Sequence, residues 1–176
     1  MIKNKAIWLF GLSGAGKTTL AKQVSQTYEK ANIKTILLDG DILRNGINKG
    51  LGFCKEDRSE NVRRIAEVCK LMLQVGTVPI VSAITPYESD RLKIMKVIGE
   101  ENLVLVHVKC PIDTCESRDP KGLYALVRKG EIKNFTGISD TYENTKIASL
   151  TINTEEDSID TSINKLLESL SIKIEI

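Results

Sequence analysis

Residues 11–18 of the chain read GLSGAGKT, and this stretch decides the fold. It fits the P-loop pattern G-x-x-x-x-G-K-[ST], whose glycines let successive backbone N–H groups turn inward around phosphate oxygens. An apolar, strand-like run precedes it at Lys5–Phe10, and apolar residues at helical spacing follow it. This order of strand, loop and helix predicts that a nucleoside triphosphate binds at the helix N-terminus. The expected ATP contacts of this stretch are Gly11, Ser13, Gly14, Ala15, Gly16, Lys17, Thr18 and Thr19.

The composition is that of an ordinary globular protein. Of the 176 residues, 41% are hydrophobic and 27% are charged, and the net charge is +2. A chain of this length fits one domain, residues 1–176, that buries roughly 70% of its unfolded surface. The sequence has no basic run interleaved with aromatic residues, no signal peptide and no apolar run of about 18 residues. We therefore expect a soluble, cytoplasmic protein that binds neither nucleic acid nor membrane.

The cysteines and the single histidine do not predict a metal site. Cys54, Cys69, Cys110 and Cys115 form no C-x-x-C pair, so core packing accounts for them better than zinc binding does. His107 lies in the apolar run LVLVHVK, and we interpret it as a strand residue rather than a catalytic base.

Strand-like apolar runs alternate with helical patterns along the chain, which predicts parallel strands joined by right-handed crossovers. We expect the α/β fold of P-loop NTPases, with a parallel five-stranded sheet flanked by helices and a lid loop. The expected strands are Lys5–Phe10, Ile33–Leu38, Val78–Ile84, Leu103–Lys109 and Ile147–Asn153. The expected helices follow the P-loop, span about Glu60–Val75 and Glu88–Ile98, follow Pro111 and begin at about Ser158. Ligands of such sheets bind outside the carboxyl ends of the strands.

One segment breaks this alternation, and we call it the lid. Residues 119–140 read DPKGLYALVRKGEIKNFTGISD, which is polar, basic and too long for an ordinary crossover. Long loops in compact domains are either functional or disordered. The apolar residues Leu123, Tyr124 and Phe135 favour a functional lid, because a disordered loop has little use for them.

The position of the acidic residues indicates the class of P-loop protein. Motors and switches place an acid that orders Mg²⁺ well downstream, yet neither VPIVSAI nor LVLVHVKC ends in an acid. Asp39 and Asp41 instead follow the second strand, in ILLDGD. A kinase that phosphorylates a hydroxyl needs a carboxylate to orient that hydroxyl and take its proton. The pattern favours a small-molecule kinase, and a turn capped by an aspartate is the alternative.

Basic residues near these acids indicate the charge of the acceptor. Arg44 follows Asp41 by three residues, and Arg58, Asn61 and Arg64 recur at steps of three along the long helix. They form either a pocket for an anion or an ordinary solvated face.

Two aromatic residues, Phe53 and Phe135, lie in polar loops. They either hold a planar base between them or anchor the loops. The residues alone therefore predict an anionic acceptor and do not decide whether it carries a planar base.

From about Lys5 to Glu143 the chain resembles the adenylylsulfate kinases, P-loop kinases that phosphorylate the 3′-hydroxyl of adenosine 5′-phosphosulfate (APS) with MgATP. The resemblance rests on GLSGAGKTTLA, LDGDILRNGIN, LGFCKEDRSENVRRIAEV, SAITPY, RDPKGLY and GEIKNFTGI. Many families share the P-loop, whereas the last four groups in this order are specific to this one. The resemblance implies that the chain makes 3′-phosphoadenylyl sulfate (PAPS) and ADP in sulfate assimilation. It also implies ATP and Mg²⁺ as cofactors and a homodimer.

The resemblance assigns roles to individual residues. The catalytic residues would be Lys17, Asp39 and Asp41, with Asp41 as the base. Thr18 would bind Mg²⁺, and Asp39 would do so through water. Arg118 would meet the adenine of ATP, and a mobile lid would exclude water. The residues that would bind APS are Asp41, Arg44, Phe53, Arg58, Asn61, Ile84, Lys121, Asn134 and Phe135.

Three other functions fit parts of the pattern. A 3′-hydroxyl kinase for another nucleoside diphosphate-like compound, such as a CDP-linked amidate, would alter the surroundings of Phe53 and Phe135, and both rings are present. A non-catalytic nucleotide-binding module would not need the intact Lys17, Thr18 and Asp41. A kinase for a sugar acid or shikimate lacks support for its acceptor. We therefore expect APS as the acceptor.

Overall fold

The structure is a computed structural model, and it describes residues 4–170 of the chain. Five strands form one sheet in the order β2-β3-β1-β4-β5, and all neighbouring strands run parallel. The predicted five-stranded parallel sheet is therefore confirmed. The strands are β1 (Ala6–Phe10), β2 (Thr35–Asp39), β3 (Val78–Ser82), β4 (Leu103–Lys109) and β5 (Leu150–Asn153).

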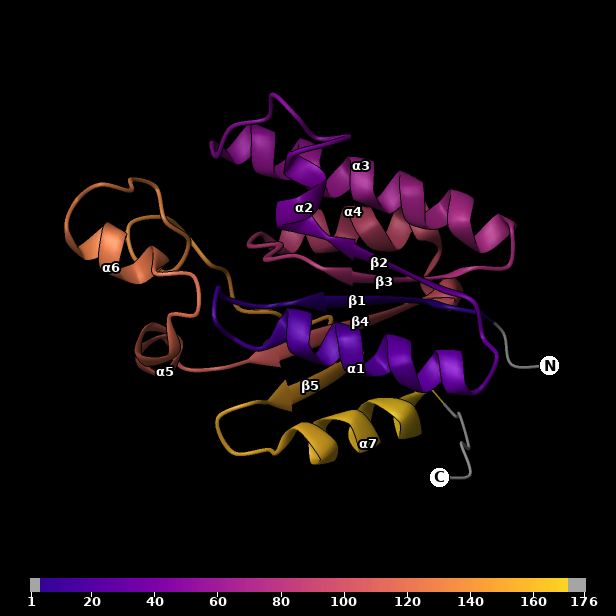
Figure 1. Cartoon of the computed structure of the whole chain (residues 1–176). Helices are drawn as coiled ribbons and strands as arrows, with labels where there is room; N and C mark the ends of the chain where they lie inside the picture. The colour runs from indigo at the N-terminus through magenta and orange to yellow at the C-terminus, as the bar shows by residue number, and fades with distance from the viewer. Residues whose placement is uncertain (1–3, 171–176) are drawn as a thin grey trace.

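Helices cover both faces of the sheet (Figure 1). Helices α1 and α7 pack on one face around Leu9, Val24 and Leu166, and α3 and α4 pack on the other around Trp8 and Ile65. Because both faces of the central strands are covered, β1 and β3 are buried along their whole length. The helices are α1 (Lys17–Lys30), α2 (Gly40–Arg44), α3 (Lys55–Gln74), α4 (Glu88–Ile98), η1 (Glu100–Asn102), α5 (Ile112–Arg118), α6 (Leu123–Arg128) and α7 (Ile159–Ser169).

Several predicted boundaries were wrong. The second strand ends at Asp39 rather than Leu38, the third ends at Ser82 rather than Ile84, and the last begins at Leu150 rather than Ile147. Helix α3 begins at Lys55, five residues before the expected Glu60. Its first turn is polar, and its buried apolar residues start only at Val62. Hydrophobic periodicity does not detect such a turn.

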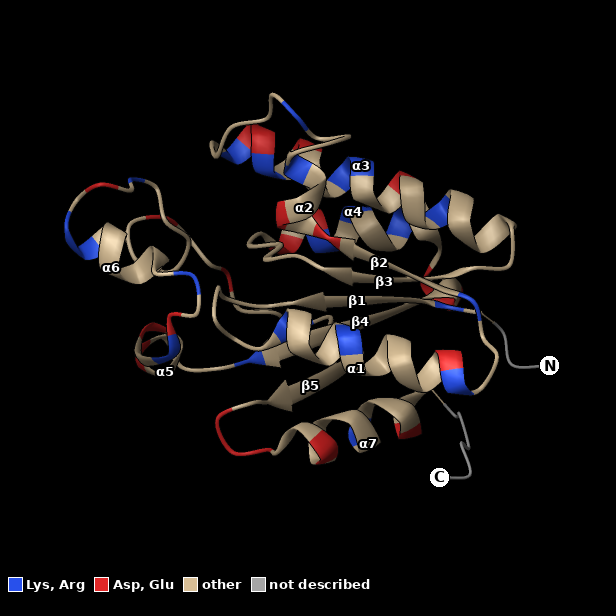
Figure 2. Ribbon diagram, in the orientation of Figure 1, with Lys and Arg blue, Asp and Glu red and all other residues tan. Residues whose placement is uncertain are grey.

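Two short α-helices, α2 and α6, and the 3₁₀ turn η1 were not expected from the sequence. Helix α2 begins directly after β2, where the Asp39 carboxylate accepts hydrogen bonds from the backbone N–H groups of Asp41 (3.0 Å) and Ile42 (3.5 Å). The aspartate cap, which was the alternative interpretation of this stretch, is thus present, and it starts a helix instead of a simple turn. Helix α6 lies within the lid, and basic residues follow it (Figure 2).

The P-loop packs its backbone so closely that two of its glycines tolerate no side chain. A Cβ atom on Gly11 would lie 2.3 Å from the carbonyl oxygen of Val108. A Cβ atom on Gly14 would lie 2.8 Å from the carbonyl oxygen of Cys115, and Gly14 has a φ of 77°. Both glycines therefore hold the loop against β4 and α5, which fixes its position at the sheet edge.

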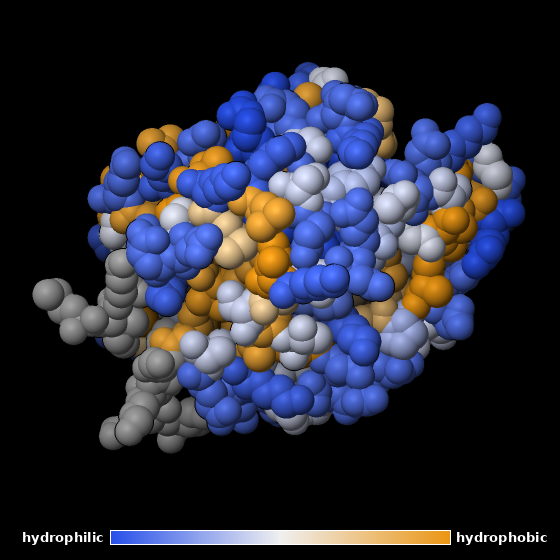
Figure 3. Space-filling model, turned by 180° about the vertical axis from the view of Figure 1, so that it is seen from behind, coloured by the Kyte–Doolittle hydropathy of each residue, from blue (hydrophilic) through white to orange (hydrophobic). Residues whose placement is uncertain are grey.

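The rear face of the molecule is mainly polar. Seen from behind, hydrophilic residues cover most of the face, and hydrophobic residues are exposed only in strips between them (Figure 3). Within residues 4–170 no helix combines the length and the apolar character that crossing a membrane requires.

A fully buried arginine joins the segment after the lid to the loop after β3. Arg91 of α4 has no exposed surface, and its guanidinium group lies 4.6 Å from the centre of the Phe10 ring and 5.3 Å from that of Tyr142. It donates hydrogen bonds to the backbone oxygens of Pro86 (3.0 Å) and Glu143 (2.9 Å). These bonds hold the chain beside the carboxyl end of β3.

The charge of Arg91 is balanced by Glu88, one turn earlier, at 2.8 Å. The other carboxylate oxygen of Glu88 accepts a hydrogen bond from the backbone N–H of Lys146, and the backbone N–H of Glu88 donates to the Glu143 carboxylate. The network is therefore closed, with cation, anion and backbone groups all paired.

We predict that the substitution Arg91→Met lowers the free energy of unfolding by about 3 to 5 kcal/mol, because it leaves Glu88 and several buried carbonyl groups without their partner. Chemical denaturation followed by circular dichroism measures this loss. The exposed Lys96→Met, on the same helix, is the control and should change stability by no more than about 0.5 kcal/mol. A loss of less than about 1 kcal/mol for Arg91→Met would show that the network is not needed for stability.

Candidate active site

The carboxyl ends of the strands meet at one edge of the sheet, next to the lid and α6 (Figure 1). The P-loop connects β1 to α1, Asp39 ends β2, and Ser82 ends β3. The residues predicted to bind nucleotide and acceptor follow different strands, and the parallel topology brings those strand ends to the same edge.

Lys17 is the buried cation of the P-loop. Its ammonium group donates a hydrogen bond to the backbone oxygen of Leu12 at 2.7 Å, and the residue is 8% exposed. Burial lowers the pKa of this group to about 8, the nearby Asp41 carboxylate raises it, and the Lys121 ammonium lowers it. The site thus holds a partly desolvated cation that an anion would stabilise.

A hydroxyl of the P-loop helix links the ends of two further strands. Thr18 Oγ1 donates a hydrogen bond to Asp39 Oδ2 at 2.9 Å and lies 3.0 Å from Ser82 Oγ. The hydroxyl and carboxylate oxygens are the hard ligands that Mg²⁺ prefers. In the described part of the chain no three His, Cys, Asp or Glu side chains cluster as a metal site. A Mg²⁺ ion at Thr18 would therefore need oxygens from a bound phosphate group, as is usual for kinases.

The second aspartate, Asp41, is not part of this link and is exposed. Its side chain lies in the first turn of α2 and is 67% exposed, in contact with the ammonium group of Lys121. The lid thus reaches across the site to α2, and the two predicted APS-binding residues Asp41 and Lys121 are brought together.

Two arginines flank one aromatic ring. The guanidinium group of Arg44 lies 4.5 Å from the centre of the Phe53 ring, and that of Arg58 lies 5.6 Å from it. Arg44 donates hydrogen bonds to the backbone oxygens of Leu51 (3.2 Å) and Gly52 (2.8 Å). Burial lowers the pKa of Arg44, and the neighbouring Arg58 adds to the effect. This pair of cations is suited to an anion with more than one charge.

Arg58 also connects α3 to the lid. It donates hydrogen bonds to the backbone oxygens of Phe53 (2.8 Å) and Asn134 (2.7 Å), and it pairs with Asp140 at 3.4 Å. Arg64, by contrast, pairs with Glu60 at 2.8 Å. The two arginines that the spacing of three residues placed on one helix face therefore have different surroundings. Arg58 lies in the site, and Arg64 lies on the charged outer surface.

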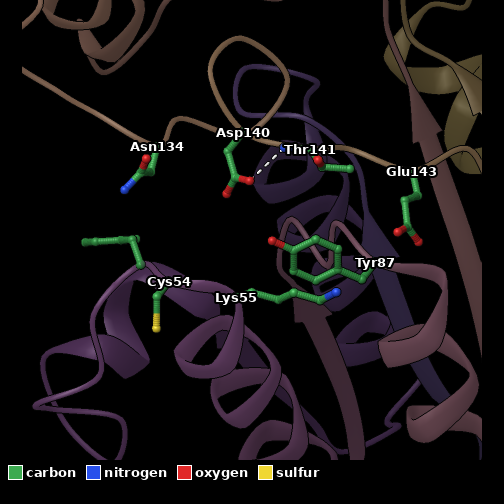
Figure 4. Close-up of a pocket in the computed structure, with 8 residues that line it drawn as sticks. Cys54, Lys55, Tyr87, Asn134, Asp140, Thr141 and Glu143 are labelled. Atoms are coloured by element: carbon green, nitrogen blue, oxygen red, sulfur yellow. Dashed lines mark hydrogen bonds between the residues drawn. The ribbon is translucent and has the colours of Figure 1, made fainter.

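A cavity of about 330 Å³ opens between α3, α4 and the lid. Figure 4 shows Tyr87 and Lys55 below it, with Asn134, Asp140 and Thr141 above. The sequence had predicted two of its lining residues as site residues, but not the others, because nothing in their local pattern marks them. The lining residues are Phe53, Cys54, Lys55, Tyr87, Asn134, Asp140, Thr141 and Glu143.

Phe53 and Phe135 differ in their surroundings. Phe53 is 57% exposed at the cavity, whereas Phe135 is partly buried and packs edge-on against Tyr124, with 5.0 Å between the ring centres. The Tyr124 hydroxyl in turn donates a hydrogen bond to the backbone oxygen of Ser13 in the P-loop at 2.9 Å. Phe135 thus anchors the lid, and its contact with a base stays a prediction.

The remaining predicted residues lie at the rim of the P-loop. The backbone oxygen of Ile84 accepts a hydrogen bond from the N–H of Gly11 at 3.3 Å. Arg118 donates to the backbone oxygen of Thr154 at 2.6 Å, and the Thr154 hydroxyl donates to the backbone oxygen of Ala15 at 2.9 Å. Thr154, which the sequence did not single out, therefore holds Arg118 beside the phosphate loop.

His107 is no candidate base. Its ring stacks on Phe10 with 5.1 Å between the ring centres, and burial lowers the pKa of the imidazole to about 4. The strand interpretation agrees with this environment.

Comparisons with known proteins agree with this geometry. A family model described as adenylylsulphate kinase matches residues 3–153. An adenylyl-sulfate kinase from Clostridium kluyveri is 46% identical over 169 residues, which cover 96% of this chain and 84% of the relative.

Two solved structures are also similar. An APS kinase from Mycobacterium tuberculosis, in complex with AMPPNP and APS, has a TM-score of 0.92 at 37% identity, covering 98% of this chain and 100% of the other. A hexameric APS kinase from Thiobacillus denitrificans has a TM-score of 0.70 at 28% identity, covering 96% of this chain and 29% of the other.

The lowered pKa of Lys17 predicts a pH dependence of stability. Because the folded-state pKa of about 8 lies below the ordinary lysine value of 10.5, the folded protein binds fewer protons than the unfolded chain between these pH values. The penalty of burying the charge is thus fully present below about pH 8 and is relieved as the pH rises. We compare the unfolding free energies of the ligand-free wild type and of Lys17→Met. Relative to Lys17→Met, the wild type should gain about 2 kcal/mol of stability between about pH 7 and pH 9.5.

Denaturant titrations of both proteins at each pH measure this difference. Titrating groups that do not interact with Lys17 occur in both proteins and cancel in the comparison. A difference that stays constant with pH would contradict the assignment of a lowered pKa to Lys17.

Proposed function

The chain belongs to the adenylylsulphate kinase family, and we propose that it transfers the γ-phosphate of ATP to the 3′-hydroxyl of APS in sulfate assimilation, forming PAPS and ADP. One observation carries this proposal: the P-loop cation, the Thr18–Asp39 link and the exposed carboxylate of Asp41 all lie at the same sheet edge. A donor site and an acceptor site therefore face each other across a short distance, as direct phosphoryl transfer requires.

ATP binds, in this proposal, with its phosphates in the P-loop. Inward-facing backbone N–H groups of residues 13–19 bind the phosphate oxygens, and the buried ammonium group of Lys17 contacts the β- and γ-phosphates. Arg118, held by Thr154, lies where it can contact the adenine. The phosphates replace the Leu12 carbonyl as the partner of Lys17, and their negative charge stabilises the ammonium form that burial disfavours.

The hydroxyl of Thr18 and the carboxylate of Asp39 would hold Mg²⁺, the latter through water. The ion would neutralise charge on the transferring phosphate. The donor set fits, because Thr18 Oγ1 and Asp39 Oδ2 are 2.9 Å apart and both are oxygen ligands. Asp39 meanwhile uses its other oxygen to start α2, so the same residue places Asp41.

Asp41 is the base of the proposed reaction. Its exposed carboxylate can accept the proton of a 3′-hydroxyl, and it lies in contact with the ammonium group of Lys121. When APS enters, Lys121 can turn from Asp41 to the anionic substrate and leave the carboxylate for the hydroxyl. The change of partner would couple closure of the lid to activation of the acceptor.

The acceptor would bind along α3. Arg44 and Arg58 contact its phosphosulfate and ribose, Asn61 donates from the same helix face, and Phe53 packs on the adenine. Lys121 and Asn134 approach from the lid, together with Phe135 and Ile84. The two arginines flanking Phe53 place an anion and a ring side by side, which is the combination that APS offers.

The assembly and location of the protein complete the proposal. We propose a homodimer, which the mass from light scattering would test. We also propose that the enzyme acts in the cytoplasm, because its proposed phosphate donor, ATP, is present there.

The choice of acceptor is tested directly by competition. We expect purified protein with MgATP to place a 3′-phosphate on APS at low concentration, in the presence of equal amounts of CDP-type nucleotides, because Phe53 and Phe135, the two rings expected to pack on adenine, are both present. Mass spectrometry and phosphorus NMR identify the product. Turnover of a CDP-type nucleotide with none of APS would favour the other acceptor class and overturn the proposal.

The role of Asp41 is tested by Asp41→Asn, which keeps the shape and removes the base. We expect kcat to fall by about 10²- to 10⁴-fold, with the KM for ATP nearly unchanged, because proton transfer is lost while the P-loop stays intact. The control Asp160→Asn makes the same change on the exposed surface of α7 and should retain wild-type kcat. If Asp41→Asn keeps kcat within about threefold of the wild type, another group is the base.

A further inference from the structure

The loop between α2 and α3 carries a buried amide side chain. Asn48 has no exposed surface, and its side-chain nitrogen donates a hydrogen bond to Asn61 Oδ1 at 2.9 Å. The same nitrogen approaches the backbone oxygen of Asn61 at 3.5 Å. The side-chain oxygen of Asn48 is buried and has no hydrogen-bond partner among the described residues.

These contacts fix the direction of both amide groups. A backbone carbonyl only accepts hydrogen bonds, so the Asn48 atom that faces it has to be the NH₂ group. That group also donates to the side chain of Asn61, which therefore turns its oxygen toward Asn48 and its nitrogen away. Across residues 4–170 the Asn61 side-chain nitrogen donates to no protein group, and it is not among the buried atoms that lack a partner. It is a donor that remains available.

The unpaired oxygen of Asn48 shows that packing alone does not explain this residue. A buried carbonyl oxygen without a partner destabilises the folded protein, and an apolar side chain of similar size would avoid that cost. What asparagine adds at this position is the donor that holds Asn61. The backbone N–H of Asn48 separately donates a hydrogen bond to the backbone oxygen of Leu43 at 2.9 Å, so this backbone contact holds the loop without the Asn48 side chain.

Asn61 lies one turn after Arg58 on α3, and both are buried. Arg58 contacts Phe53 and Asn134 at the acceptor cavity. An amide nitrogen beside this arginine favours an anionic oxygen, which only accepts hydrogen bonds, and an amide oxygen in its place would repel one.

We propose that Asn48 is a positioning residue that orients Asn61 so that its side-chain nitrogen donates to a phosphosulfate oxygen of APS. The inference rests on the proposed function. Asn48 does not touch the substrate, so its whole effect on the acceptor passes through Asn61.

The test is a double-mutant cycle in steady-state kinetics. Asn48→Leu removes the donor and lets Asn61 turn, so the KM for APS should rise at least about tenfold, as for a lost bond to a charged group. The KM for ATP should stay within about twofold, because the P-loop is untouched. In an Asn61→Ala background, Asn48→Leu should change the KM for APS by less than about twofold, since coupled residues are not additive.

Asn45→Leu is the matched control, because Asn45 is exposed in the same loop and should leave both KM values unchanged. If Asn48→Leu does not fold, Asn48→Ala replaces it with the same expected pattern. The proposal is overturned if the KM for APS is unchanged, if both KM values rise equally, or if the effect persists in the Asn61→Ala background. Turnover of APS by the wild-type protein reports separately on the proposed function. If the wild type does not turn over APS, the proposed function is overturned. If the wild type turns over APS and Asn48→Leu leaves the KM for APS unchanged, only this inference is overturned.

Discussion

The hydrogen bond from the Thr18 hydroxyl to the Asp39 carboxylate holds the two halves of the site together. Thr18 belongs to the helix that follows β1, and Asp39 ends β2, which is separated from β1 by β3. Ser82, at the end of β3, lies 3.0 Å from the same hydroxyl. The ends of β2 and β3 thus meet at one hydroxyl of the helix that follows β1. Because Asp39 also starts α2, the bond relates the phosphate loop to Asp41, and the acceptor side of the site is built outward from it.

The charges of the site are arranged for anions that arrive from outside. Lys17 is buried with a lowered pKa, and Arg44 and Arg58 lie close enough to oppose each other's charge. Such crowding disfavours the empty site and is relieved when phosphate or sulfate groups enter. Lys121 adds a further cation from the lid and contacts Asp41. The lid therefore contacts both sides of the site: Tyr124 contacts the P-loop, Lys121 contacts Asp41, and Asn134 contacts Arg58.

Much of this architecture could be predicted from the sequence, because its signals are local. The P-loop pattern, the alternation of apolar runs and the two aspartates after β2 are each contained within a few residues, and the five parallel strands followed from them. The start of α3 could not be found this way, because its first turn is polar. The short α2 depends on the Asp39 cap, which a sequence pattern does not separate from a turn. Ser82, Thr154 and most cavity residues act through tertiary contacts, and so do Arg91 and Asn48, whose roles appear only when segments distant in sequence are brought together.

The central claim is that the carboxyl ends of the strands hold donor and acceptor in line, with Asp41 at the reacting hydroxyl. A crystal structure of the protein with APS and a non-hydrolysable ATP analogue tests this most directly. The account predicts that an Asp41 oxygen lies within about 3.2 Å of the 3′-hydroxyl, that Lys121 has moved to the substrate, and that this hydroxyl points at the γ-phosphate. An acceptor whose 3′-hydroxyl lies beyond the reach of Asp41 while another carboxylate contacts it would contradict the account.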